Sequence, residues 1–176
     1  MGTNPICFAF PSAGEPVIWD IGTSAIIHAE VVLAGRLGQE LPPGMAFDAT
    51  GETTRNPAAA LSGALAAWGG HRGGGLGLVV QLLGVLAGSP AVPGELSEFG
   101  FLTIAIRPDL LTDTQTFLDE VATYGDAVRG TRPIPGGVSV RMPFDRSRLA
   151  RAERIASGII EVPEAVVVAL QTRWGS

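Results

Sequence analysis

The sequence predicts an α+β fold, in which helices pack against a sheet. Two short apolar runs, residues 6–10 and 17–19, are separated by Pro, Ser and Gly, a pattern typical of two strands joined by a turn. Apolar residues at helical spacing recur through much of the remaining chain. Since 176 residues are about the length of one domain and no linker or repeat interrupts them, we expect a single domain over residues 1–176.

Six helices are expected from end signals and apolar spacing. Thr23 or Ser24 can cap the first helix, which Gly38 would end, and Pro57 suits the first turn of the second. The first helix runs to about residue 37, and the others are predicted over residues 57–68, 76–87, 114–124, 146–157 and 163–171.

The segments between these helices are predicted to be strand or loop. Residues 99–106 are rich in β-forming side chains and precede a Pro-Asp turn, so we expect a central strand there. Residues 138–142 are a further candidate strand. Residues 41–57 and 132–137 are rich in turn-forming residues and are predicted to be loops.

The chain carries little charge for its size. Charged residues make up 16% and hydrophobic residues 46%, and the mean hydropathy is +0.31, whereas charged residues usually reach about 25%. We therefore expect an exposed apolar face that is covered in a homodimer, by a partner chain or by a missing segment. The net charge of −5, with no Lys and no basic run, gives no electrostatic footprint for nucleic acid.

The cysteine count and the hydropathy pattern predict a cytoplasmic protein that does not enter a membrane. Cys7 is the only cysteine, which excludes an intrachain disulfide and a thiolate-rich zinc site, and its apolar neighbours favour a buried thiol. No metal site is predicted. The longest apolar stretch, residues 76–87, is shorter than the ~20 residues that cross a bilayer, so we expect it to be a helix of the soluble core.

A glycine run, residues 69–77, carries the clearest chemical signal and precedes an apolar helix. Free N–H groups at a helix N-terminus attract phosphate, and His71 and Arg72 would add side-chain donors. Tight packing of a helix against a sheet calls for the same glycines, so that alternative stays open. The absence of Lys and of a Gly-x-Gly-x-x-Gly spacing excludes a P-loop and a Rossmann fingerprint.

Two polar residues, His28 and Glu30, interrupt an apolar stretch that is predicted to be helical. They suit a solvated helix face, or a site in which a carboxylate orients an imidazole for acid–base work. Asp48, Asp109 and Asp113 are predicted to cap turns. No serine has nucleophile-elbow spacing, which disfavours hydrolase chemistry.

Five sequence blocks occur in the order typical of one enzyme family. They are Gly2-Thr3-Asn4-Pro5, Trp19-Asp20-Ile21-Gly22-Thr23-Ser24, Phe47-Asp48 through Gly51 to Thr54, Gly69-Gly70-His71-Arg72-Gly73, and Ile134-Pro135-Gly136. Through these blocks essentially the whole chain resembles the malate/L-lactate dehydrogenase family, a group of non-Rossmann NAD(P)-dependent reductases. This family also includes ureidoglycolate, sulfolactate, diketogulonate and piperideine-carboxylate enzymes.

The resemblance implies a cofactor domain built on a largely antiparallel sheet with packed helices, in a dimer whose sites lie between domains. It implies NAD or NADP as cofactor and a small 2-oxo acid or cyclic imine as substrate. Glu30 and His28 would be the catalytic candidates, and the substrate would contact Thr3, His28 and Ala29. The cofactor would contact Ile21, Gly22, Thr23, His71, Arg72, Arg132, Pro135, Gly136 and Gly137.

Several positions depart from the family pattern. The family usually has Lys at Arg72, an aromatic residue at Gly74, Arg-Gly at His28-Ala29, and Glu at Gly137. Arginine can still bind phosphate, and bidentately. The change at His28-Ala29 removes the arginine that would recognise a substrate carboxylate.

Family members also carry a helical N-terminal region, ahead of the first block, that supplies the proton-donating histidine and a substrate arginine. This sequence begins at that block, so we expect it to be inactive by itself. A fragment, one subunit of a split enzyme and a truncated descendant are the open explanations. The leading function is the cofactor-binding portion of an NAD(P)-dependent oxidoreductase acting on 2-oxo acids or cyclic imino acids. The alternative is a non-redox descendant that serves as a binding or assembly module, or that catalyses an unrelated reaction in the retained pocket.

Overall fold

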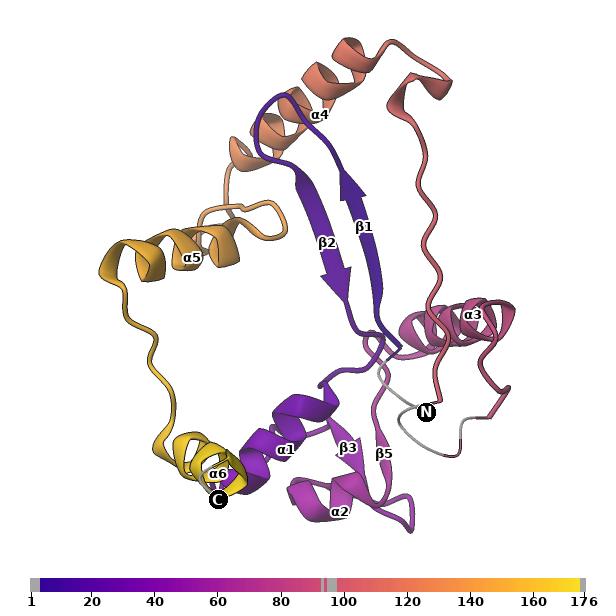
Figure 1. The fold of residues 1–176 in the computed structure, drawn as a ribbon, viewed down its shortest axis with the longest axis vertical. Coiled ribbons are helices and arrows are strands. Elements are labelled where there is room, and N and C mark those ends of the chain that lie inside the picture. The colour runs from indigo at the N-terminus through magenta and orange to yellow at the C-terminus, as the bar shows by residue number, and fades with distance from the viewer. Residues whose placement is uncertain (1–3, 93, 95–97, 175–176) are drawn as a thin grey trace. The chain divides into compact units, whose positions relative to one another are not determined.

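The computed structural model describes residues 4–92, 94 and 98–174. The chain divides into two compact units, and each is described by itself. Unit 1 comprises residues 1–6, 21–103 and 161–176, and unit 2 comprises residues 7–20 and 104–160. Figure 1 shows helices and short strands in both, which is the predicted α+β class. The single domain expected over residues 1–176 stays a prediction.

A small antiparallel sheet in unit 1 is built from three two-residue strands. They are β3 (Ala46–Phe47), β4 (Thr53–Thr54) and β5 (Ala64–Leu65), in the order β4-β3-β5. Ala46 pairs with a residue on each side, Thr54 in β4 and Leu65 in β5. The segment predicted to be loop over residues 41–57 therefore supplies two strands of this sheet.

Helix α2 (Pro57–Leu61) begins at Pro57, as predicted, and the Asn56 side chain caps it by accepting a hydrogen bond from the Ala59 N–H at 3.1 Å. The expectation that this helix continues to residue 68 is wrong. At Gly63 a Cβ atom would lie 2.1 Å from the Phe47 carbonyl oxygen, so the chain here passes directly against β3. Pairing of β5 with β3 ends the helix early.

Helix α1 (His28–Arg36) begins later than the predicted caps, Thr23 and Ser24. Ser24 instead forms an isolated β-bridge with Ala67, and the Ala25 N–H donates to the Ala66 carbonyl at 2.7 Å. These contacts hold the backbone extended before α1, so the predicted capping role is wrong. The end of the helix is as predicted, because Gly38 follows it with a φ of +64°.

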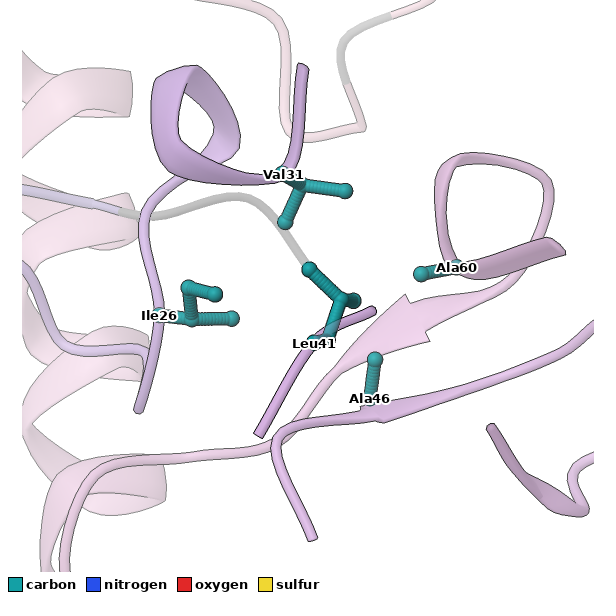
Figure 2. Packing of buried hydrophobic residues seen from close by; sticks show 5 residues of the cluster. All are labelled: Ile26, Val31, Leu41, Ala46 and Ala60. Carbon is teal, nitrogen blue, oxygen red and sulfur yellow. The ribbon is translucent and has the colours of Figure 1, made fainter. Parts of the chain in front are cut away.

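The hydrophobic core of unit 1 lies between α1, α2 and the sheet. Figure 2 shows Ile26, Val31, Leu41, Ala46 and Ala60 pointing toward one another. Val31 and Leu41 are fully buried. Leu41 comes from a loop, and two hydrogen bonds with Arg55 fix its backbone: its N–H donates to the Arg55 carbonyl at 2.8 Å, and its carbonyl accepts from Arg55 Nε at 2.9 Å.

Helix α3 (His71–Leu86) begins at His71. Residues 71–77 of the glycine run therefore lie inside the helix, whereas the whole run was expected to precede it, and only Gly69 and Gly70 do so. Its large apolar side chains are not in a core. Leu78, Leu82 and Leu86 are 54%, 67% and 75% exposed, and among the helix residues only Gly73 and Gly77 are buried. The expectation of a core helix is therefore wrong for this structure. Within the described residues, no helix is long and apolar enough to cross a membrane.

Residues 99–106 form no strand, although a central strand is predicted there. Phe99 and Phe101 are 73% and 82% exposed. The β-forming side chains of this stretch have no partner strand in the described part of the chain, and a strand needs one to satisfy its backbone. The candidate strand over residues 138–142 is absent too. Helix α6 (Glu164–Trp174) follows near the C-terminus, close to its predicted range.

Unit 2 contains most of a two-stranded hairpin together with two longer helices. Strands β1 (Ile6–Phe10) and β2 (Val17–Ile21) match the prediction and run in opposite directions in Figure 1. Cys7 in β1 is exposed, so the expected buried thiol is wrong. The hairpin turn contacts the first long helix, because the Ala13 N–H donates to the Leu118 carbonyl at 3.1 Å.

The helices of unit 2 are the short 3-10 helix η1 (Pro108–Leu110), α4 (Thr114–Arg129) and α5 (Asp145–Ser157). Helix α5 lies close to its predicted range and α4 begins as predicted, but α4 runs on to residue 129, past its predicted end at 124, and η1 was not predicted. Asp113 caps α4, as predicted, by accepting from the Thr116 N–H at 2.9 Å. Asp48 in unit 1 caps its own turn in the same way, accepting from the Thr50 N–H at 2.9 Å.

Candidate functional site

At the N-terminus of α3 in unit 1, the N–H groups of His71, Arg72 and Gly73 donate to no acceptor within the described chain. His71 and Arg72 are the first two residues of the helix, and both are exposed. Gly70 at the N-cap has no side chain to accept a hydrogen bond, and Gly69 and Gly70 adopt φ values of +62° and +65° that favour glycine. The first N–H groups of a helix lack acceptors within the helix, so this end suits an anion.

The glycines of the run serve different purposes. A Cβ atom on Gly73 would lie 1.8 Å from the Trp68 carbonyl oxygen, so packing requires glycine there. A Cβ on Gly74 would meet only the Ala67 side chain, at 4.0 Å, and one on Gly75 would meet nothing within 4 Å. Close packing thus explains why residue 73 is glycine. It does not explain why residues 74 and 75 are glycine, because the described chain leaves space for a side chain at both positions.

The structure brings Thr23 next to the segment that leads into α3. The Trp68 N–H donates to the Thr23 carbonyl at 2.9 Å, three residues before His71. Together with the Ser24–Ala67 bridge, this bond ties the two segments side by side. Thr23 is only 4% exposed, so its place is set by packing as well. Two blocks far apart in the sequence thus meet within unit 1.

His28, Ala29 and Glu30 form the first turn of α1, and all three are exposed. The Glu30 Oε2 atom accepts a hydrogen bond from the Ile27 N–H at 3.2 Å. This is the geometry of a helix cap. Within the described chain no hydrogen bond or ion pair joins Glu30 to His28, which favours the solvated helix face over an oriented imidazole.

Thr3 lies outside the described residues, but its neighbour Asn4 is anchored to α3. The Asn4 Nδ2 atom donates to the Gly77 carbonyl at 3.0 Å. Asn4 also has a φ of +32°, which asparagine tolerates better than most residues. The sequence analysis missed this contact, since no local pattern links residues so far apart.

The predicted cofactor residues of unit 2 lie in an exposed loop with a tight turn. Gly136 has a φ of +74°, and the Gly137 N–H donates to the Ile134 carbonyl at 2.8 Å. Proline followed by glycine at the centre, with positive φ at the glycine, is typical of a type II turn. Pro135 and Gly136 occupy those two positions, and Arg132 precedes the turn. The predicted irregular segment over residues 132–137 is confirmed.

An ion pair at the two ends of this loop was not predicted. The guanidinium of Arg129, at the end of α4, donates to both carboxylate oxygens of Asp145, at the start of α5, with N···O distances of 3.0 Å. These bonds hold the pKa of Asp145 below its ordinary value and raise that of Arg129. No group of three His, Cys, Asp or Glu side chains among the described residues could hold a metal ion.

Comparisons with known proteins show the family of the chain. A model of the malate/L-lactate dehydrogenase family matches residues 1–171. The chain is 36% identical, over 94% of its length, to Delta(1)-pyrroline-2-carboxylate reductase 1 of Burkholderia ambifaria, and 34% identical, over 94%, to (2R)-3-sulfolactate dehydrogenase (NADP(+)) of Chromohalobacter salexigens. In each case it covers 50% of the relative.

Solved structures show the same fold. A dehydrogenase from Sinorhizobium meliloti superposes with a TM-score of 0.83 at 33% identity, covering 98% of this chain and 52% of that protein. The chain spans about half the length of the curated relatives it matches. The predicted fold, with its small antiparallel sheet and packed helices, is confirmed. Because the family model covers nearly all of the chain, this protein belongs to the malate/L-lactate dehydrogenase family.

Proposed function

We propose that this chain is the cofactor-binding portion of an NAD(P)-dependent oxidoreductase that interconverts 2-oxo acids, or cyclic imino acids, with their reduced forms. The similar proteins are named as reductases of pyrroline carboxylate and dehydrogenases of sulfolactate. The observation that carries the proposal is the Thr23–Trp68 hydrogen bond, since it ties Thr23 to the segment that leads into α3. A cytoplasmic location and a homodimer, or a partner chain, belong to the same proposal.

The phosphates of the cofactor would lie at the start of α3. The free N–H groups there and the side chains of His71 and Arg72 supply donors to an anion. Arg72 is the only cation of the glycine run and can bind two phosphate oxygens at once. Gly74 and Gly75 leave the surface without Cβ atoms, so a ligand can approach the backbone closely.

The rest of the cofactor would contact two further segments. Ile21 and Gly22 would lie against the nicotinamide nucleotide, with Thr23 fixing them to Trp68. The turn that contains Pro135, Gly136 and Gly137, with Arg132 before it, would contact the remainder. When bound, NAD or NADP supplies or accepts the hydride. The role of the chain is to bind and orient the dinucleotide.

The substrate would contact Thr3, His28 and Ala29, and His28 and Glu30 would handle the proton. The Ile27 N–H already donates to Oε2 of Glu30, so the proton would be handled by the other carboxylate oxygen, Oε1. We expect the 176-residue chain, assayed alone, to show no measurable NADPH oxidation with pyruvate or piperideine-carboxylate, because within the described residues no hydrogen bond from Glu30 orients His28 as an acid. Robust turnover that His28→Ala abolishes would assign the acid to His28 and contradict this expectation.

Calorimetry with NADH and NADPH tests cofactor binding directly. Arg72→Ala should weaken binding by ~1.5–3 kcal/mol, the usual scale for a hydrogen bond to a charged group. Arg36→Ala is the matched control, because Arg36 is an exposed arginine of the same unit at the end of α1. Equal losses in the two variants, or no binding by the unaltered chain, would refute the proposed function.

A further inference from the structure

The Arg129–Asp145 ion pair closes the loop of residues 130–144. Arg129 Nε lies 3.0 Å from Asp145 Oδ2, and Arg129 Nη2 lies 3.0 Å from Asp145 Oδ1. The Asp145 side chain is 12% exposed and that of Arg129 is 34% exposed. A bidentate, partly desolvated pair of this kind is stronger and more directional than an ordinary surface ion pair.

Asp145 also holds the last residues of the loop. Its Oδ2 atom accepts a hydrogen bond from the Met142 N–H at 2.9 Å, and Met142 is buried. Between these residues Phe144 has a φ of +69°, a left-handed conformation that costs a bulky residue free energy. Such a conformation persists only where surrounding contacts over-determine it, and Asp145 supplies those contacts.

The middle of the loop has little to hold it by comparison. Residues 131–139 are exposed, and among the described hydrogen bonds only the turn bond from Gly137 to Ile134 lies between residues 132 and 141. The orientation of that turn is therefore set where the loop leaves α4 and where it enters α5. Arg129 stands at the first of these points and Asp145 at the second.

We propose that Arg129 and Asp145 are positioning residues that hold the 130–144 loop closed, so that its Pro-Gly turn is presented to the dinucleotide. The inference rests on the proposed function, because it gives the loop a cofactor to contact. Neither residue needs to touch that cofactor. Arg129 acts through Asp145, and Asp145 acts through the backbone of Met142 and Phe144.

Trypsin cleavage after Arg141 and NADPH affinity together test this inference. Arg141 is an exposed residue inside the loop. In Arg129→Met, we expect cleavage of the 141–142 bond to become about tenfold faster and NADPH binding about tenfold weaker, which corresponds to the loss of one hydrogen-bonded charge pair. Arg129→Lys keeps the positive charge but cannot donate to both carboxylate oxygens in the geometry of a guanidinium. Its cleavage rate and its NADPH affinity should therefore lie between those of the unaltered chain and those of Arg129→Met. Arg107→Met, which removes an exposed ion pair with Asp109, is the control and should change neither measurement.

A structural role alone predicts a different result. If Arg129→Met lowers the unfolding temperature while cleavage after Arg141 and NADPH affinity stay at the level of the control, the inference is wrong. Faster cleavage with unchanged NADPH affinity would also overturn it, because the loop would then be held for stability only. If the unaltered chain does not bind NADPH, the proposed function fails, and the cleavage rate alone decides whether the pair holds the loop.

Discussion

The two glycine-containing segments predicted to contact the cofactor are built by different means. At the start of α3, Gly73 is required because the Trp68 carbonyl lies where its side chain would be. In the turn of unit 2, Gly136 is required because its φ is +74°, and a Cβ there would have open space. Packing therefore requires glycine at position 73, and backbone conformation requires it at position 136.

The supports of the two segments differ in the same way. The α3 start is fixed by backbone pairing, through the Ser24–Ala67 bridge and the bond from Trp68 to Thr23. The turn of unit 2 lies in an exposed loop, and the charged side chains of Arg129 and Asp145 join the two ends of that loop. Changes of shape should therefore damage the first segment, and changes of charge should damage the second.

The largest effect is expected from Gly73→Ala. A methyl group 1.8 Å from the Trp68 carbonyl cannot be accommodated without moving the helix, and overpacking of this severity should cost at least about 3 kcal/mol of unfolding free energy. Urea unfolding followed by tryptophan fluorescence measures it. Gly74→Ala is the control, since its Cβ has 4.0 Å of space. Equal stability of the two variants would contradict the packing role of Gly73.

Gly136→Ala should have a smaller effect. Holding a residue with a side chain at positive φ costs about 1–2 kcal/mol, and the turn can partly relax because it is exposed. Gly136→Asn should lose less, because asparagine tolerates the left-handed region. Faster trypsin cleavage after Arg141 in the alanine variant than in the asparagine variant is the expected readout. The same rate in both would show that positive φ does not matter in this turn.

The sequence predicted best the elements that local signals define. The β1–β2 hairpin, the cap of α4 by Asp113 and the turn at Pro135-Gly136 depend on residues within a few positions of one another. The predicted start of α1 was wrong because Ser24 pairs with Ala67, and this contact between distant residues overrides the preference of serine for a helix cap. Residues 99–106 have strand propensity, but propensity without a partner strand does not make a strand.

The candidate site shows the same limit. The glycine run predicted that a helix begins in this part of the chain, yet the sequence could not show that α3 begins at His71 or that Gly73 faces the Trp68 carbonyl, because both depend on the packing around Trp68. Arg129 and Asp145 were missed, since an ion pair between two helix ends leaves no periodic pattern. The side-chain contact of Asn4 with Gly77 was missed for the same reason.

Acid should weaken the loop of unit 2 selectively. The pKa of Asp145 is lowered, chiefly by hydrogen bonds from Arg129 and in part by the Met142 N–H, with Arg148 adding a favourable charge. The stabilisation by this carboxylate is therefore present above the ordinary aspartate pKa of about 3.9 and is lost as the pH falls through the lowered folded value.

The difference in unfolding midpoint between the unaltered chain and Asp145→Asn measures that contribution. It should be constant near neutral pH and shrink only in strong acid. Asp20→Asn, at an exposed position of β2, provides the comparison and should leave the midpoint unchanged. A difference that is already gone at neutral pH would show that the charge of Asp145 does not hold the loop.

The smallest change in stability is expected from Gly75→Ala, and it has the opposite sign. Gly75 is a helical residue whose Cβ would meet nothing within 4 Å, so alanine should stabilise α3 by up to about 1 kcal/mol. If glycine is present so that a phosphate can approach the backbone, the same variant should bind NADPH more weakly despite its greater stability. Urea unfolding and calorimetry on one preparation separate the two effects. A gain in stability with unchanged affinity would mean that the glycine run is explained by Gly69, Gly70 and Gly73 alone, and that no ligand comes close to the backbone at Gly75.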